Sequence, residues 1–447
     1  MKKSKLLLAI GLAVTTLTAC GNSEKPAETG AAPEKTTEQS KEETKQESKT
    51  EGGKLNILAP QNSVNDGTHA MVDAFEQKYG IEVTLELLPD NEAENLIRSR
   101  AATGDLGDIV DFHSGSQLTN LSPEDNLLEI TGESYLDSID EGFLNCVTVN
   151  GKVYGTPIGP VFAGGVFYNK NIYQELGLEI PQTWDEFLDN CKKCEEAGYT
   201  GIIGTYGDAW TSQMILLSDY YYVNTANPQF ADDYTAGKAT LADCPEYVRS
   251  IEKLVSQKEY FNDDYLSATN DDGVRMLAEG RGAHQIMRTR EYNAMLESYP
   301  EAEEAVGMFA VPGDNAEDVG VTLWMPHGYY IANNAKNLEE AKLWQEFTTS
   351  KEGVEAYISG ASPVGPFLLK GVDVGDSVKP AIADAMEYVN QGKSSPAMEF
   401  VCPVKGTNMA QICVQIGSGE IDVEQGVAAL HADNVKYAQQ LGLEGWK

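Results

Sequence analysis

The sequence has few basic residues for its length. Lysine and arginine together account for 33 of the 447 residues, against 69 aspartates and glutamates, and the formal net charge is −36. A surface this negative repels nucleic acid and anionic lipid headgroups, so we expect no nucleic-acid partner. A neutral ligand would feel little of this field, whereas an anionic ligand would need arginines close to it.

Metal-binding residues and catalytic motifs are scarce as well. The five histidines are scattered along the chain, which argues against a metal site. The sequence contains no His-Glu-x-x-His motif, no Gly-x-Ser-x-Gly motif, no P-loop and no dinucleotide-binding glycine pattern. We therefore predict a protein that is not an enzyme and holds no metal or cofactor. Acidic residues are so abundant that a carboxylate pair could always be proposed, so the alternative is a secreted carbohydrate-active enzyme such as a glycoside hydrolase.

The seven cysteines give no pairing that can be read from their spacing. Cys191 and Cys194 form a Cys-x-x-Cys pair inside a helical stretch that begins at Trp184, not at a strand-to-helix turn where a thiolate would be activated. No second cysteine pair or histidine cluster lies nearby in sequence to complete a zinc site. We interpret the pair as structural and leave a disulfide between the two open.

The N-terminus is an export signal followed by a spacer. Three lysines precede an apolar stretch over residues 6–17, which is too short to span a bilayer as a mature helix. The stretch ends in Leu-Thr-Ala-Cys at Cys20, which resembles the lipobox of bacterial lipoproteins. The resemblance implies a signal peptide over residues 1–19 and acyl chains on Cys20. Residues 20–53 contain no aromatic or large aliphatic residue, so we predict a disordered tether. No other stretch is apolar enough to span a bilayer. Together with the export signal and Cys20, this predicts a protein outside the cytoplasm that is held to the membrane only by its lipid anchor.

The rest of the chain, residues 54–447, alternates strands and helices. Residues 55–59, 81–85 and 108–112 form short apolar strands, and residues 68–79 and 92–102 between them have helical periodicity. Further strands are expected over residues 166–168, 283–287, 307–311 and 329–332, and a capping box at Thr183 and Glu186 begins another helix. This alternation predicts an α/β protein with a mostly parallel sheet covered by helices, and its length predicts two lobes.

In open parallel sheets, ligands bind at the carboxyl ends of the strands, where loops and helix N-termini converge. This rule selects six loops before any family is considered. They cover residues 61–63, 113–114, 162–164, 208–210, 288–290 and 324–327.

Several motifs, in order and at matching separations, resemble the extracellular solute-binding proteins of sugar ABC transporters, the maltose-binding-like family 1. Residues 75–83 match F-x-x-x-x-G-I-x-V, and residues 151–157 match G-K-x-Y-G-x-P. Tyr-Asn-Lys at 168–170 and Pro-x-Thr-Trp-Asp-Glu-Phe at 181–187 are the most specific. The chain departs from the family pattern at Gly107, where the family usually has proline.

The resemblance implies a type II periplasmic-binding-protein-like fold with two lobes, joined by hinge strands around an interlobe cleft. Crossings are expected near residues 157–165, near 311 and near 363–367. Lobe 1 would contain residues 54–160 plus 311–365, and lobe 2 would contain residues 166–306 plus 370–447. The implied function is to capture a soluble sugar, expected to be an oligosaccharide, as a monomer and to deliver it to the permease subunits of an ABC importer. The same fold could instead bind a non-sugar solute such as a peptide or a polyamine.

A protein captures a sugar by placing an aromatic ring on its C–H face and planar donors and acceptors around its hydroxyls. We expect Trp210 to be the stacking platform, because it follows glycines in a loop and does not belong to an apolar stripe. Arg288 or Arg290 could bind a ring edge or an acidic sugar. The candidate ligand-binding residues are Gln61, Asn62, Asp111, His113, Phe162, Asp208, Trp210, Arg288, Trp324 and His327.

Overall fold

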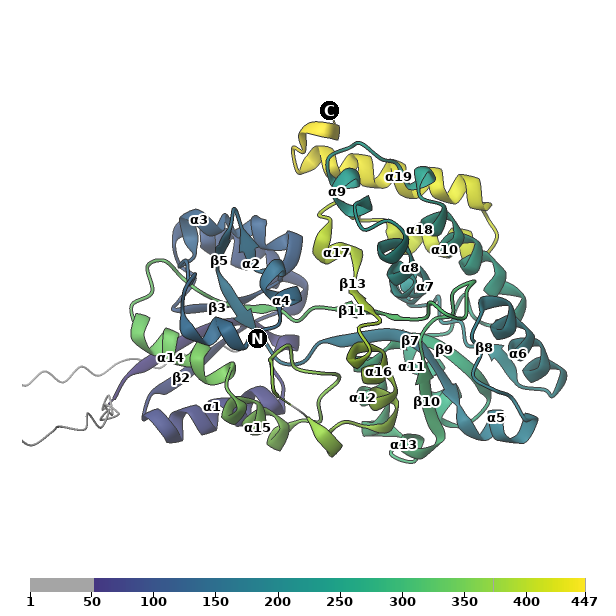
Figure 1. The fold of residues 1–447 in the computed structure, drawn as a ribbon, viewed down its shortest axis with the longest axis horizontal. Helices are drawn as coiled ribbons and strands as arrows, with labels where there is room; N and C mark the ends of the chain where they lie inside the picture. Colours follow the sequence, from purple (N-terminus) through teal and green to yellow (C-terminus); the bar gives the residue numbers. More distant parts are fainter. Residues whose placement is uncertain (1–51, 373, 447) are drawn as a thin grey trace, which may run out of the picture. The chain divides into compact units, whose positions relative to one another are not determined.

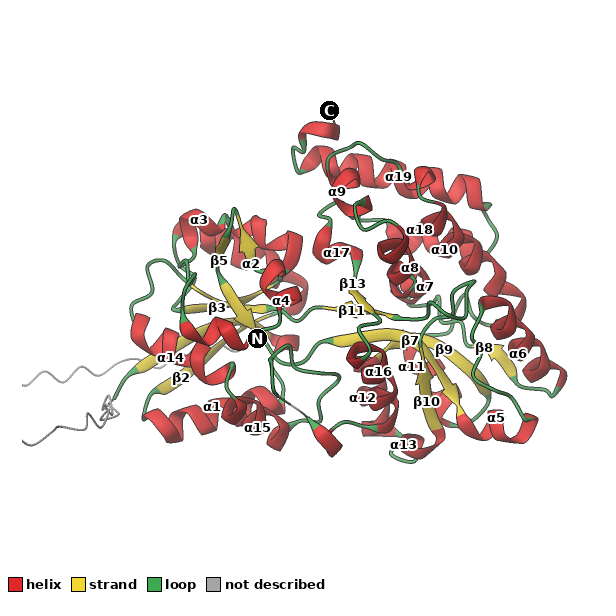
Figure 2. Cartoon of the chain, viewed as in Figure 1, coloured by secondary structure: helices red, strands yellow, loops and turns green. Residues whose placement is uncertain are grey.

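The computed structural model describes residues 52–372 and 374–446. The predicted signal peptide, Cys20 and nearly all of the predicted tether lie outside these residues. Within the described part of the chain, no helix is both long enough and apolar enough to cross a membrane. The α/β class is confirmed, and the strands form two main sheets and a small hairpin (Figures 1 and 2).

The first sheet has the strand order β2-β1-β3-β12-β6. Strands β1, β2 and β3 are parallel, as predicted, and β12 runs antiparallel to both β3 and β6. Their bounds are β1 Lys54–Pro60, β2 Glu82–Leu88, β3 Ile109–Phe112, β6 Gly155–Pro157 and β12 Gly328–Ile331. The core beside this sheet is aromatic, with the Phe75 ring 5.1 Å and the Tyr329 ring 5.7 Å from the Trp344 ring.

The second sheet is built around β7 and has the order β13-β11-β7-β9-β8, with β10 also paired to β7. Strand β7 runs antiparallel to all three of its partners, β9, β10 and β11, so the prediction of a mostly parallel sheet is wrong for this half. The bounds are β7 Phe162–Asn169, β8 Thr200–Ile202, β9 Gly282–Arg288, β10 Val306–Phe309, β11 Val321–Trp324 and β13 Ser394–Pro396.

The predicted boundary at residue 311 does not divide the sheets. Strand β11 pairs with β7 and β13 in the second sheet, although residues 311–365 were assigned to lobe 1. The chain returns to the first sheet only at β12, after the segment 325–327. Just after the third expected crossing, Leu369 forms a bridge with Ile139, and the Leu368 carbonyl accepts from the Asp140 N–H.

Helices cover both sheets, and local sequence signals explain where several of them begin. Helix α1 starts after Asn65, whose side chain accepts from the Thr68 N–H, and it ends at Gly80, which has a φ of 70°. The predicted capping box of Thr183 and Glu186 is confirmed at the start of α6. Asn150 and Gly151, both with positive φ, form the turn of the β4–β5 hairpin, Thr148–Val149 and Lys152–Val153.

The helices have the following bounds: α1 Asp66–Tyr79, α2 Asp90–Thr103, α3 Pro123–Asn126, α4 Glu141–Cys146, α5 Lys170–Leu176, α6 Trp184–Glu196, α7 Met214–Ser218, α8 Tyr220–Ala226, α9 Phe230–Thr235, α10 Pro245–Ser256, α11 Asn270–Ala278, α12 Thr289–Ser298, α13 Ala302–Ala305, α14 Leu338–Thr348, α15 Lys351–Gly360, α16 Pro380–Asn390, α17 Met398–Val401, α18 Met409–Gly417 and α19 Val423–Gln440. Helices α10, α18 and α19 pack together near the C-terminus (Figure 1). Cys191 and Cys194 are both buried in α6 as free thiols.

Candidate functional site

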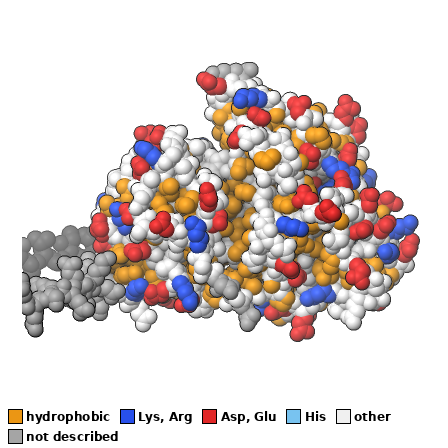
Figure 3. Space-filling model, viewed as in Figure 1, with side chains coloured by type: hydrophobic (Ala, Val, Ile, Leu, Met, Phe, Trp, Pro, Cys, Tyr) orange, Lys and Arg blue, Asp and Glu red, His pale blue; other side chains and the backbone are white. Residues whose placement is uncertain are grey.

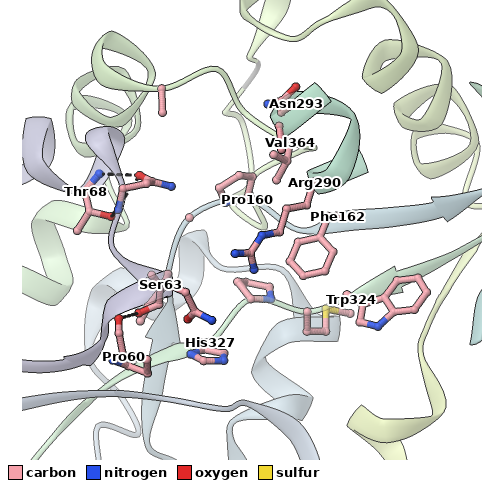
Figure 4. Close-up of a pocket in the computed structure, with 18 of the residues that line it drawn as sticks. Pro60, Ser63, Thr68, Pro160, Phe162, Arg290, Asn293, Trp324, His327 and Val364 are labelled. Carbon is pink, nitrogen blue, oxygen red and sulfur yellow. Dashed lines mark hydrogen bonds between the residues drawn. The ribbon is translucent and has the colours of Figure 1, made fainter. Parts of the chain in front are cut away.

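A cavity of about 1040 Å³ lies where the first sheet meets the segments that connect it to the second (Figure 4). Pro60 at the end of β1 and His113 just after β3 line it from the first sheet. Phe162 opens β7, Trp324 ends β11, and His327 precedes β12. The cavity therefore forms at strand ends and at two of the chain crossings, as expected for an open α/β sheet.

Helices contribute further lining residues. Asn65 and Thr68 come from the start of α1, and Arg290 and Asn293 come from the first two turns of α12. Tyr357 of α15 also lines the cavity, and its hydroxyl accepts a hydrogen bond from Asn65 Nδ2 at 2.9 Å. The donors and acceptors around the cavity thus come from elements that are far apart in sequence.

Asp111 lies behind the cavity wall and holds two of the residues that line it, Ser63 and His327. Its side chain is buried, and Oδ1 lies 2.7 Å from Nδ1 of His327. Its other oxygen, Oδ2, accepts from the hydroxyl of Ser63. Because Asp111 occupies Nδ1 of His327, it orients that ring and leaves Nε2 for other partners.

His113 is a neutral neighbour of this pair. Its ring centroid lies 4.4 Å from that of His327, with the two rings nearly perpendicular. Burial, together with the charge of His327, lowers the pKa of His113 to about 3. His113 therefore carries no charge at neutral pH and can both donate and accept a hydrogen bond.

Phe162 is the aromatic side chain best placed to offer a face to the cavity. It is half-buried, and it stacks on Trp324 with ring centroids 6.4 Å apart and an angle of 13° between the planes. Trp324 is only 4% exposed, so it backs Phe162 and offers no open face of its own. The guanidinium of Arg288 lies 5.6 Å from the Phe162 ring and 5.5 Å from the Trp210 ring.

Five of the ten candidate residues from the sequence line the cavity. They are Asn62, His113, Phe162, Trp324 and His327. Asp111 lies just behind the wall and acts through Ser63 and His327. The rule that ligands bind at strand ends found these residues, because all of them follow or end a strand of the two sheets or lie in a connection between them.

Four candidates take other positions and do not line this cavity. Gln61 is an exposed residue that opens a short 3₁₀ turn. The carboxylate of Asp208 accepts from the Asn270 N–H at 2.7 Å, ahead of helix α11. Arg288 forms an ion pair with Glu291. Trp210 is half-buried against the core beside the second sheet, so in this arrangement its ring is a neighbour of Arg288 and not a wall of the cavity.

Other residues of the cavity gave little signal in the sequence. Asn293, Tyr357 and Phe400 lie within or beside helices, where a polar or aromatic residue is ordinarily read as surface or packing. Ser63 and Arg290 fall in two of the selected loops, but neither was among the ten candidates. The turn from β9 into α12 sends Arg288 toward Glu291 and Arg290 into the cavity, a difference that spacing alone could not predict.

Acidic side chains outnumber basic ones in the lining of the cavity, as they do in the whole chain. Its lining includes two basic side chains, Arg290 and Lys379, and six carboxylates: Asp66, Asp90, Glu94, Glu297, Glu303 and Glu399. Acidic side chains are scattered over the face seen in Figure 3, with hydrophobic ones gathered toward its centre. Some carboxylates are neutralised locally, since Glu303 pairs with Lys379 at 2.8 Å and Glu399 pairs with Lys405.

Two of the curated proteins similar to this chain are sugar-binding proteins by name. The Multiple sugar-binding protein of Streptococcus mutans is 26% identical over 336 residues, which is 67% of this chain and 76% of that protein. The melibiose/raffinose/stachyose-binding protein MelE of Bacillus subtilis is 25% identical over 230 residues, covering 49% of this chain and 52% of that protein.

Solved structures show the same fold. The apo-form of RafE from Streptococcus pneumoniae aligns with a TM-score of 0.71 at 20% identity, over 87% of this chain and 98% of that chain. RafE in complex with raffinose gives a TM-score of 0.69 at 20% identity, over 85% and 98%. The family model for bacterial extracellular solute-binding proteins, which are binding proteins and not enzymes, matches residues 61–355. This chain therefore belongs to the bacterial extracellular solute-binding protein family.

Proposed function

We propose that this chain binds an oligosaccharide outside the cell membrane and delivers it to the permease subunits of an ABC importer. The observation that carries the proposal is the cavity of about 1040 Å³, with the half-buried Phe162 ring on one wall and amide, hydroxyl and imidazole groups around it. Small-molecule sites commonly measure about 300–1,000 Å³, so this cavity has room for more than one sugar ring. The names of two curated relatives support a sugar as the solute.

Phe162 would lie against the C–H face of one sugar ring, because an aromatic ring buries apolar area without leaving a polar group unpaired. Asn62, His113 and His327 would hydrogen-bond the hydroxyls of the bound sugar. Asp111 would hold His327 in place through its hydrogen bond to Nδ1. The ligand would favour a closed arrangement of the two lobes by contacts available only when both touch it.

The proposal includes the membrane anchor. Residues 1–19 would be removed as a signal peptide, Cys20 would carry acyl chains, and residues 20–53 would tether the monomeric binding protein. The support is the sequence itself, with its basic start, its apolar stretch and the Leu-x-Ala-Cys ending in the required order. Two or more acyl chains give a stable anchor, since each buried CH₂ contributes about 0.8 kcal/mol.

The test is calorimetry of the purified protein with a panel of mono- and oligosaccharides, a peptide and a polyamine, for the parent and two aromatic variants. We expect an oligosaccharide to bind and Phe162→Ala to weaken it by about tenfold or more, because a stacked ring is removed. Trp210→Ala should weaken it less, since Trp210 does not line the cavity. Phe261→Ala, outside the cavity, controls for general loss of packing. Binding of the peptide or the polyamine alone would refute the sugar assignment, and full affinity in Phe162→Ala would refute its role as platform.

A further inference from the structure

Arg290 is exceptional among the arginines of this chain. All seven arginines lie within the described residues, and the other six each form an ion pair with a carboxylate. The side chain of Arg290 makes no hydrogen bond or ion pair with any other described residue. In a chain with twice as many acidic as basic residues, an arginine without a carboxylate partner is unexpected.

Arg290 lies where its guanidinium can contact a ligand in the cavity. It is the second residue of α12, it is exposed, and it projects into the cavity on the wall that also holds Phe162 and Asn293 (Figure 4). Arg288, two residues earlier, is occupied by Glu291, with Nε 3.0 Å from Oε2. The turn into α12 therefore holds one arginine in a structural pair and leaves the other free inside the cavity.

A second donor lies within electrostatic range of Arg290. Burial raises the pKa of the Tyr357 phenol, while Asn65 and the charge of Arg290 oppose that rise. The Tyr357 oxygen accepts from Asn65 Nδ2, and its own proton is not donated to any other described residue. An oxyanion beside Arg290 could thus receive hydrogen bonds from the guanidinium fork and from the Tyr357 hydroxyl.

The carboxylates of the cavity do not occupy this position. Glu303, Glu399 and Glu94 are each paired with a basic side chain, and Asp90 accepts from the Asn62 N–H at 2.8 Å. Asp66 and Glu297 form no ion pair with another described residue, and neither lies within ion-pair distance of Arg290. The acidic lining therefore repels an anion elsewhere in the cavity and restricts it to the neighbourhood of Arg290.

We infer that the solute is an acidic oligosaccharide, with a uronic acid carboxylate that binds Arg290. This inference rests on the proposed function and narrows its substrate class. A carboxylate matches the guanidinium fork with two parallel hydrogen bonds, whereas the hydroxymethyl group of a neutral hexose offers a single oxygen. Arg290 thus recognises the carboxylate, and Phe162 contacts the sugar ring as in the proposed function.

The experiment compares matched disaccharides that differ only in a hydroxymethyl group or a carboxylate at C6, in the gluco and galacto series, by calorimetry. We expect the parent to bind the uronate about tenfold or more tightly than its neutral partner, and Arg290→Gln to abolish this preference. Arg290→Lys, which keeps the charge but loses the fork, should retain part of it. Arg275→Gln is the matched control, because it removes the same charge from an exposed ion pair outside the cavity.

Each outcome decides between the two proposals. A parent that prefers the neutral disaccharides, or an Arg290→Gln variant that loses affinity for both members of a pair equally, overturns the acidic substrate and leaves the proposed function standing. Equal losses would mean that Arg290 binds ring hydroxyls or stabilises closure. Failure of every sugar in the panel to bind would overturn the proposed function, and this inference with it.

Discussion

Two histidines with lowered pKa values should make the stability of this protein fall steeply below pH 6.5. Burial lowers the pKa of His284 to about 4, and burial together with His327 lowers the pKa of His113 to about 3. In the unfolded chain both would titrate near 6.5. The unfolded state therefore binds more protons than the folded state between these values, and stability decreases as the pH falls through that window.

The size of the effect follows from these values. At pH 5 an unfolded histidine with a pKa of 6.5 is almost fully protonated, while the two folded ones remain almost fully neutral. Each histidine then costs about 2 kcal/mol relative to neutral pH, or about 4 kcal/mol for both. Total stabilities are commonly about 5–15 kcal/mol, so this loss would be easy to measure. His431, whose pKa is also lowered by burial, acts in the same direction.

The carboxylate of Asp108 acts in a different window. Burial raises the pKa of Asp108, but hydrogen bonds from Asn337, Asn56 and Lys336 lower it below its usual value of 3.8. Its contribution to stability is therefore present above pH 4 and is lost only at lower pH. Asp108 therefore does not add to the loss of stability between pH 6.5 and 5, whereas burial raises the pKa of Asp384 and so acts against that loss.

The assay is urea unfolding followed by tryptophan fluorescence at pH 7, 6 and 5. His113→Asn should remove about one of the protons taken up on unfolding, so the slope of the free energy of unfolding against pH should fall by about 1.4 kcal/mol per pH unit near pH 5. His69→Asn should leave the slope unchanged, because His69 is exposed on α1. A parent whose stability is flat from pH 7 to 5, or a His113→Asn slope equal to that of the parent, would show that His113 is charged or exposed in the folded protein.

Two further predictions concern the core and the anchor. Lys253 is 2% exposed, and its Nζ lies 2.6 Å from Oδ1 of Asp219, which is 1% exposed. Lys253→Met should therefore lower the free energy of unfolding in urea by about 3–5 kcal/mol, and adding Asp219→Asn should restore part of the loss. An equal loss in the double variant would contradict the reasoning. Cys20→Ser should move the protein from the membrane fraction to the soluble fraction on cell fractionation, and an unchanged membrane fraction would refute the anchor.

The parts of the fold that depend on local signals were predictable. Asn65 and Thr183 cap helices through side chains that contact the backbone three residues on, and Gly80 ends α1 because it tolerates a positive φ. These interactions are complete within one turn of helix, so the sequence contains all of their partners. Strand β11 was missed because all four of its residues are buried and it lacks the alternation that marks a half-buried strand, and β13 was missed because its sequence is Ser-Ser-Pro.

The candidate site was only partly predictable for a related reason. The loops could be selected from strand ends, but which side chain of a loop enters the cavity depends on distant partners. Asp111 was expected to contact the ligand, yet Ser63 and His327, 48 and 216 residues away, enclose it. Trp210 was expected to be the stacking platform because of its residue type and its loop, but Phe162 lines the cavity and Trp210 does not.

The missed strand β11 changes how ligand and lobes would be coupled. Trp324 ends β11 in the second sheet, His327 precedes β12 in the first, and the residues between them line the cavity. The connection between the sheets is therefore itself a wall of the site, backed by Asp111 on one side and by Phe162 on the other. Any rotation of one sheet against the other must be absorbed by dihedral angles in the few residues of such connections. A ligand that contacts Phe162 and His327 together would hold this connection in one geometry, so binding and closure would use the same residues.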